Sequence, residues 1–169
     1  RDDDRDDAIA EGFESVLRHV ADPSAERGGR SAATQGWGSD GMQILALGQM
    51  QARLAAIQRG ELDGMVIEAA TENEELKVKI LKQVDALARP EVILATNTSS
   101  ISITKLAAAT SRPGKFVGMH FFNPVPMMAL VEIIRGLQTS DATHDAVREL
   151  ALQLGKTPVS VRNAPGFVV

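Results

Sequence analysis

Residues 116–132 read FVGMHFFNPVPMMALVE, and this stretch decides the fold because a proline-containing loop separates two apolar segments within it. The first segment, residues 116–119, predicts a buried strand with His120 at its end. The two prolines disfavour continued strand pairing or an immediate helix. The second segment places Glu132 among aliphatic neighbours. The imidazole and the carboxylate form a candidate acid/base pair, although a lone histidine is more often structural and the carboxylate could face solvent.

The segments around this stretch alternate between short apolar runs and amphipathic helices. The predicted elements are strands at 65–67, 92–94, 116–119, 130–134 and 158–162, and helices at 74–88, 102–109 and 141–154. The first three strands are continuous apolar runs, which is typical of parallel strands covered on both faces and joined by right-handed crossovers. The sequence therefore predicts an α/β fold, a partial Rossmann-like, doubly wound and mainly parallel sheet.

The N-terminal third follows a different pattern. Residues 8–20 and 42–59 carry apolar residues at helical spacing and predict two helices, with a polar loop between them. We therefore divide the chain into a helical and loop segment, residues 1–63, and a Rossmann-type domain, residues 64–169.

The loop between these helices contains the motif Gly36-x-Gly38-x-x-Gly41. It spells a dinucleotide-binding fingerprint, which requires a strand before the glycines and a helix after them. The preceding residues make a poor strand, whereas 42–59 make a good helix. A glycine-bearing loop is therefore favoured over a phosphate-binding turn.

Composition and charge narrow the function. The chain has 169 residues, enough for one core, and its net charge of −4 weighs against a nucleic-acid partner. No apolar run is long enough to cross a bilayer, so we expect no membrane partner. The absence of cysteine excludes disulfides, thiolate zinc sites and cysteine nucleophiles, and it fits a cytoplasmic protein. We also expect a fragment of a longer protein, because the chain starts at Arg1 and stops at Val169 inside an apolar segment.

Polar residues follow the first three predicted strands. Residues 68–73, 97–100 and 120–123 stand where these strands end. Each cluster taken alone resembles an ordinary turn, since Asn, Ser and Thr are favoured there. Ligands of open parallel sheets bind beyond the carboxyl ends of the strands. Together the clusters would line one rim with carboxylate, amide, hydroxyl and imidazole groups, which suits a polar ligand.

Four strings between residues 64 and 169 carry a resemblance to a known family: VIEAATENEELKVKIL, ATNTSSISITKLA, GMHFFNPVPMMALVEII and GKTPVSVRNAPGFVV. Their order and spacing closely resemble the NAD-binding domain of the 3-hydroxyacyl-CoA dehydrogenases. The resemblance implies an oxidoreductase that moves a hydride between C3 of a 3-hydroxyacyl-CoA, or the matching 3-oxoacyl-CoA, and NAD. It implies no metal.

The resemblance also implies roles for individual residues. His120 would be the general base, Glu132 would orient its ring and stabilise the protonated form, and Ser99 would hydrogen-bond the substrate 3-oxygen. An imidazole can take the hydroxyl proton near neutral pH, and a carboxylate on its far nitrogen fixes the tautomer. The residues implied to contact the cofactor or the substrate beside it are Ala69, Ala70, Glu72, Lys77, Asn97, Ser99 and Asn123.

Two parts of the family pattern have no counterpart here. The first strand, glycine-rich turn and acid-bearing second strand are not recognisable before residue 64, so NAD and NADP are not distinguished. The catalytic Asn after GFVV, and the helical C-terminal domain through which relatives form homo-oligomers, would follow Val169. We therefore weigh two hypotheses, an incomplete dehydrogenase that is weak or inactive alone and a catalytically incompetent nucleotide- or acyl-CoA-binding remnant. A dehydrogenase for another small hydroxy acid is disfavoured because HFFNPVP and NTSS occur together.

Overall fold

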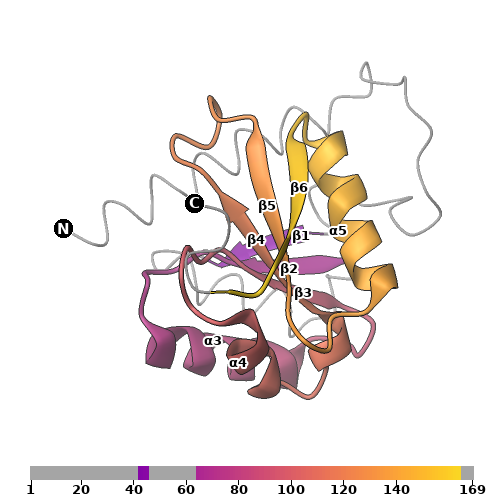
Figure 1. The fold of residues 1–169 in the computed structure, drawn as a ribbon. Coiled ribbons are helices and arrows are strands. Elements are labelled where there is room, and N and C mark those ends of the chain that lie inside the picture. Colours follow the sequence, from indigo (N-terminus) through magenta and orange to yellow (C-terminus); the bar gives the residue numbers. More distant parts are fainter. Residues whose placement is uncertain (1–41, 46–63, 165–169) are drawn as a thin grey trace.

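The computed structural model of the chain describes the strand Met42–Leu45 and residues 64–164. These residues form a six-stranded sheet with helices on it (Figure 1). In chain order the described elements are β1 (Met42–Leu45), β2 (Met65–Glu68), α3 (Glu74–Leu87), β3 (Ile93–Thr96), α4 (Ile103–Ala108), the 3-10 turn η4 (Pro113–Lys115), β4 (Phe116–Phe121), β5 (Leu130–Arg135), α5 (Asp141–Gln153) and β6 (Thr157–Arg162).

The strands lie in the sheet in the order of the chain, β1-β2-β3-β4-β5-β6. All neighbouring pairs are parallel except β4 and β5, which are antiparallel. Because of this reversal, β5 begins at the same edge of the sheet at which β2, β3 and β4 end. The mainly parallel α/β sheet predicted from the sequence is confirmed.

Helices cover both faces of the sheet. Figure 1 shows α3 and α4 on one side and α5 on the other. Alternate residues of β2 belong to two separate apolar clusters, since Met65 and Ile67 join the cluster that contains α5 while Val66 joins the one that contains α3 and α4. This double burial explains why the strands are continuous apolar runs, and it confirms the doubly wound arrangement.

Local hydrogen bonds set the ends of the helices. The side chains of Asn73, Ser102 and Ser140 accept backbone N–H groups in the first turns of α3, α4 and α5. Gly155, with φ of 70°, ends α5 as the sequence predicts. The N–H of Gly155 donates to Leu152 and that of Lys156 to Ala151, a pairing that satisfies the last carbonyls of the helix.

The helix predicted over residues 42–59 is wrong in its first four residues, because Met42–Leu45 is strand β1 and pairs in parallel with Met65–Glu68. A short apolar run fits a helix or a strand equally well, and here a pairing partner far along the chain decides. The glycine motif ending at Gly41 is thus followed by a strand instead of the helix that the fingerprint requires. Its glycines, residues 46–59 and the predicted helix at 8–20 lie outside the described residues.

Candidate active site

His120 and Glu132 face each other across the antiparallel pair of β4 and β5. The register places the two residues directly opposite, and His120 Nδ1 lies 2.7 Å from Glu132 Oε2. The glutamate side chain is 2% exposed and the histidine side chain 15%, so the acid lies beneath the ring and the ring reaches the surface. An ionised carboxylate can only accept hydrogen bonds, so this contact fits a ring that carries a proton on Nδ1. The structure therefore brings the two side chains into contact, and their role as an acid/base pair stays a prediction.

The surroundings of His120 tie the end of β4 to the end of β3. Asn97 Oδ1 accepts the backbone N–H of Phe121 at 3.0 Å, one residue beyond the histidine. The ring of Phe122 lies against the imidazole, with 4.7 Å between ring centres and 50° between ring planes. Asn97 therefore lies at the rim beside His120.

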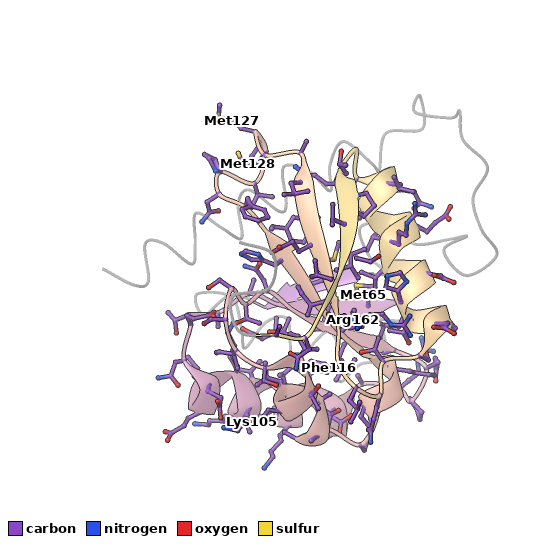
Figure 2. The ribbon with its side chains drawn as sticks, viewed as in Figure 1. Met65, Lys105, Phe116, Met127, Met128 and Arg162 are labelled. Carbon is purple, nitrogen blue, oxygen red and sulfur yellow. The ribbon has the colours of Figure 1, made fainter. Side chains whose placement is uncertain are left out.

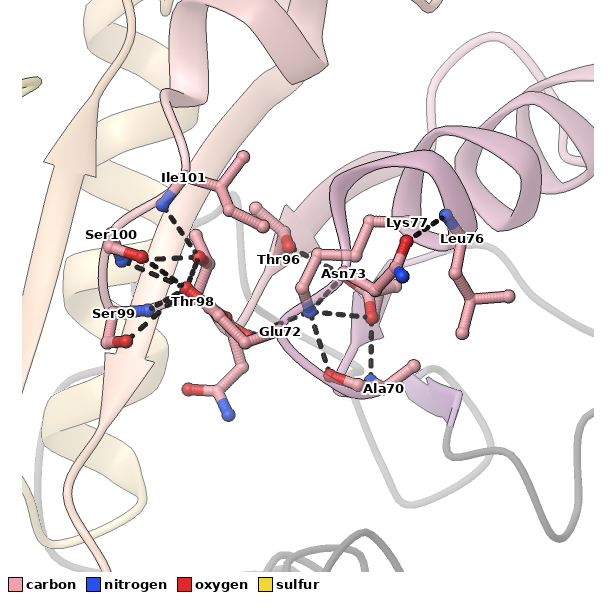
Figure 3. A network of polar contacts seen from close by, with 12 residues as sticks. Ala70, Glu72, Asn73, Leu76, Lys77, Thr96, Thr98, Ser99, Ser100 and Ile101 are labelled. Atoms are coloured by element: carbon pink, nitrogen blue, oxygen red, sulfur yellow. Dashed lines mark hydrogen bonds and ion pairs between the residues drawn. The ribbon is translucent and has the colours of Figure 1, made fainter. Parts of the chain in front are cut away.

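One carboxylate oxygen of Glu72 accepts hydrogen bonds from several residues of the turn after β3, as Figure 3 shows. Oε1 accepts the hydroxyl groups of Thr98 at 2.5 Å, Ser100 at 2.9 Å and Ser99 at 3.3 Å. It also accepts the backbone N–H groups of Ser99 and Ser100, at 3.1 and 3.0 Å. Burial raises the pKa of the Glu72 carboxyl, but the bonds from Thr98 and Ser100 and the charge of Lys77 outweigh it and lower the pKa below its ordinary value. Glu72 is consequently ionised at neutral pH.

Lys77 lies below the rim, fully buried. Its ammonium donates to both oxygens of Glu68 at 3.0 Å and to the carbonyls of Ala70 and Asn97 at 2.9 and 3.2 Å (Figure 3). Burial raises the pKa of the Glu68 carboxyl above its ordinary value, although the Lys77 charge and the Thr96 hydroxyl oppose that rise. The resemblance gives Lys77 a cofactor contact, whereas the bonds seen here join the ends of β2 and β3.

The remaining predicted residues occupy the same edge of the sheet. Ala69 and Ala70 follow β2, both buried, and the Ala70 N–H donates to Glu68 Oε1 at 2.6 Å. Asn123 is exposed in the loop that follows β4. Two side-chain groups thus lie at this rim. In one Ser99 contacts Glu72, and in the other His120 contacts Glu132.

Glu68, Thr98 and Ser100 belong to the polar clusters expected at the strand ends, but the sequence assigned them no individual role at this rim. The signal for Glu68 was present, because Lys77 occupies the inward stripe of α3 together with Ile80, Leu81 and Val84. A cation on such a stripe requires a buried acidic partner. Within residues 42–45 and 64–164 there is no cluster of three or more His, Asp or Glu side chains that could hold a metal ion. None of the described helices is long and apolar enough to cross a membrane.

Comparison with known proteins agrees with this geometry. Residues 4–164 match the model of the family described as 3-hydroxyacyl-CoA dehydrogenase, NAD binding domain. A probable 3-hydroxybutyryl-CoA dehydrogenase of Deinococcus radiodurans is 57% identical over 104 residues, which is 62% of this chain and 37% of the relative. The fatty acid oxidation complex subunit alpha of Acinetobacter baumannii is 40% identical over 169 residues, which is 96% of this chain and 23% of that protein.

Among solved structures, the (S)-3-hydroxybutyryl-CoA dehydrogenase of Ralstonia eutropha superimposes with a TM-score of 0.64 at 60% identity. The match covers 74% of this chain and 46% of that one. The chain thus spans less than half the length of these relatives. Because the family model covers nearly all of its residues, the chain belongs to the 3-hydroxyacyl-CoA dehydrogenase family, in which it corresponds to the NAD-binding domain.

Proposed function

We propose that this chain is the cofactor-binding and acid/base part of a dehydrogenase that moves a hydride between C3 of a 3-hydroxyacyl-CoA and NAD. The 2.7 Å contact between His120 Nδ1 and Glu132 Oε2 carries the proposal, because this reaction requires a base that takes a hydroxyl proton. The relatives named 3-hydroxybutyryl-CoA dehydrogenase support a short 3-hydroxyacyl-CoA as the substrate.

The chemistry of the pair follows from the ring's orientation. In oxidation the substrate's 3-hydroxyl loses its proton while the hydrogen on C3 leaves as a hydride. Since Nδ1 holds its proton toward Glu132, Nε2 is the nitrogen that takes the hydroxyl proton. The resulting imidazolium lies against a buried carboxylate, which stabilises its charge more strongly than an exposed carboxylate would. In the reverse direction the same nitrogen returns the proton to the 3-oxygen.

The residues after β2 and β3 fit a nucleotide cofactor. All five hydrogen bonds to Glu72 reach Oε1, so within the described residues Oε2 remains as an acceptor for ribose hydroxyl groups. The small side chains of Ala69 and Ala70 allow the nucleotide to approach the backbone closely. The resemblance adds a contact from Lys77 to the cofactor. NAD, when bound, supplies the hydride acceptor.

The substrate end of the site would be formed by Ser99, Asn97 and Asn123. The Ser99 hydroxyl is at present 3.3 Å from Glu72 Oε1, a weak hydrogen bond that leaves it able to turn toward the substrate 3-oxygen. Asn97 already fixes the backbone beside His120 through Phe121. Asn123 is exposed on the loop, where its amide is accessible to a ligand.

The test measures NADH oxidation with acetoacetyl-CoA, by the chain and by a protein extended at both ends to the length of its relatives, which we call the complete product. We expect His120→Gln to lower kcat by roughly 10²- to 10⁴-fold, the usual contribution of a general acid–base group. NADH affinity should stay unchanged, since His120 acts on the substrate. His144→Gln is the matched control, because His144 lies on α5, the helix on the face of the sheet opposite α3 and α4, and contacts Ser160 of β6.

The outcomes separate the dehydrogenase from its alternative. If the complete product turns over acetoacetyl-CoA and His120→Gln does not, the proposal is supported. If the complete product binds NADH or acyl-CoA without oxidising NADH, it is a catalytically incompetent binding remnant. Turnover retained in folded His120→Gln protein would remove His120 from the role of base.

A further inference from the structure

Lys156 is a buried cation outside the two side-chain groups of the rim. It follows Gly155, which ends α5, and precedes Thr157, the first residue of β6. The residue is 7% exposed, and its ammonium donates to the backbone carbonyls of Val125 at 2.5 Å and Met128 at 2.9 Å. Within the described part of the chain, no carboxylate lies within ion-pair distance of this ammonium.

The two carbonyls belong to the loop of residues 122–129, which joins β4 to β5. Pro124 and Pro126 have no N–H, so the loop has few backbone donors for its own carbonyls. The Pro124 carbonyl accepts the N–H groups of Met127 and Met128, each at 3.0 Å. Figure 2 shows both methionine side chains at the outer end of the loop, away from the sheet. The loop therefore depends on donors from elsewhere in the chain.

Three attachments hold this loop against the sheet. The side chain of Val125 is 2% exposed and belongs to the apolar cluster that contains α5. The N–H of Thr157 donates to the carbonyl of Ala129 at 2.7 Å, where β6 begins. The Lys156 ammonium supplies the third, and it bonds two loop carbonyls at once.

Burying an ammonium without a counter-ion costs free energy, because the ion gives up water. That cost lowers the pKa of Lys156 below its ordinary value. An apolar side chain would avoid the cost but would leave both loop carbonyls without these donors. Hydrogen bonds from a charged donor are about twice as strong as neutral ones, so the cation fixes the loop more firmly than a neutral donor would.

The same loop connects the strands that carry His120 and Glu132, and it contains Asn123. We propose that Lys156 is a positioning residue, which bonds the carbonyls of Val125 and Met128 and so holds the loop in the conformation that presents Asn123 and His120 to the substrate. This inference rests on the proposed function, in which those two side chains meet the acyl-CoA.

The test compares three variants of the complete product, the protein whose turnover tests the proposed function. Lys156→Met keeps the length of the side chain and removes all its donors, whereas Lys156→Arg keeps both charge and donors. Lys115→Met is the matched control, because the Lys115 ammonium also bonds a carbonyl, that of Pro90 at 3.0 Å, but on an exposed surface. Hydrogen exchange of the Met127 and Met128 amides reports the order of the loop, and steady-state kinetics report its effect on turnover.

In Lys156→Met we expect exchange of these two amides to speed up roughly tenfold or more, as loss of charged hydrogen bonds implies. We expect kcat to fall by a similar factor while KM for NAD changes less than about twofold, because the Glu72 group is untouched. Lys156→Arg should recover part of both effects, and Lys115→Met should show neither. Wild-type exchange and kcat in folded Lys156→Met would overturn the inference. So would a uniform rise in exchange over α3 and the loop, which indicates a purely structural role.

If Lys156→Met does not fold, Lys156→Gln is measured in the same way, and a partial loss of loop protection is expected because neutral donors bind less strongly. Full protection together with full kcat in folded Lys156→Gln would also overturn the inference. If the wild-type protein shows no turnover, the proposed function fails while the exchange measurement still decides whether Lys156 holds the loop.

Discussion

We expect the negative charge of Glu132 to matter for turnover. A glutamine in its place has the same shape and keeps the packing, so it tests the charge. Glu132→Gln preserves the volume of a side chain that is 2% exposed, but it no longer stabilises the imidazolium and can donate to Nδ1, which favours the wrong tautomer. We expect kcat to fall by roughly 10²- to 10⁴-fold with KM for NAD unchanged. Steady-state kinetics with 3-hydroxybutyryl-CoA, together with a thermal melt that establishes folding, measure the effect.

The control for this substitution is Glu91→Gln, since Glu91 pairs with Arg89 on the surface and its side chain is 56% exposed. Activity in this variant should match that of the wild-type protein. A loss of kcat in Glu132→Gln no larger than in Glu91→Gln would show that the buried carboxylate is dispensable for turnover.

The family resemblance was sufficient to pair His120 with Glu132, whereas the antiparallel register that brings them opposite each other came only from the structure. It was not sufficient for Lys77. A residue's position in a motif does not show how deeply its side chain is buried. The Lys77 side chain is fully buried under the rim, where it forms an ion pair with Glu68. Its contact with the cofactor stays a prediction.

The contact between α4 and β4 depends on a residue without a side chain. A Cβ added at Gly118 would lie 2.7 Å from Ile103 Cδ1 and 2.9 Å from Ile134 Cβ. The Ile103 side chain on α4 can rotate away, but the Cβ of Ile134 is fixed on the neighbouring strand. We expect Gly118→Ala to lower the free energy of unfolding by about 1–3 kcal/mol, the usual cost of overpacking.

Urea unfolding of Gly118→Ala beside Gly114→Ala measures this cost. At Gly114 the nearest atom to an added Cβ is the Gln138 carbonyl oxygen at 3.6 Å, an ordinary contact. The Gly114 variant should therefore be neutral or slightly more stable. Equal stability of the two variants would mean that the sheet relaxes freely around Gly118.

Asp85, near the end of α3, holds the segment that leads into β4. Its carboxylate accepts the Ser111 N–H at 2.6 Å and the Arg112 Nε–H at 2.6 Å. Burial raises the pKa of Asp85, but the bonds from Ser111 and Arg112 outweigh it and lower the pKa below its ordinary value. A carboxyl with a lower pKa in the folded state stabilises the fold at pH values above its unfolded pKa, near ~3.9. This stability is lost as the pH falls through that value toward the lower folded pKa.

We therefore expect Asp85→Asn to lower the free energy of unfolding near neutral pH by about 1–3 kcal/mol. Its difference from the wild-type protein should shrink as the pH falls below about 4. Urea unfolding at several pH values measures the difference, with Glu75→Gln, an exposed position on α3, as the control. A difference that is constant with pH would show that the Asp85 carboxyl is not coupled to folding.

The helices α3, α4 and α5 could be predicted from their apolar stripes and capping residues, which are local signals. Strand β1 could not, because Met42–Leu45 is extended only through its pairing with β2. The conformational preferences of these four residues do not reveal that a pairing strand exists elsewhere in the chain. The antiparallel direction of β5 is likewise absent from the hydrophobic pattern, since buried strands look alike in either direction.

Across the whole sheet, the direction of the strands explains why the rim forms at one edge. β2, β3 and β4 end there and β5 starts there, so residues separated by more than 60 positions, from Glu68 to Glu132, meet at one rim. The reversal between β4 and β5 is essential to this arrangement. A parallel β5 would carry Glu132 away from the edge at which His120 stands.

A ligand that binds this rim should stabilise the entire sheet, because binding to the folded state alone shifts the unfolding equilibrium by mass action. At NADH concentrations 100-fold above Kd, the gain is about 2.7 kcal/mol, which corresponds to a rise in Tm of roughly 5–11 °C for a chain of this size. A thermal melt of the chain with and without NADH measures the rise. Glu72→Ala should show a smaller rise at the same NADH concentration, because the ribose acceptor is gone, whereas His120→Gln should keep the full rise. The absence of any rise in a folded chain, at NADH concentrations that saturate the extended protein defined above, would mean that these residues do not hold the cofactor by themselves.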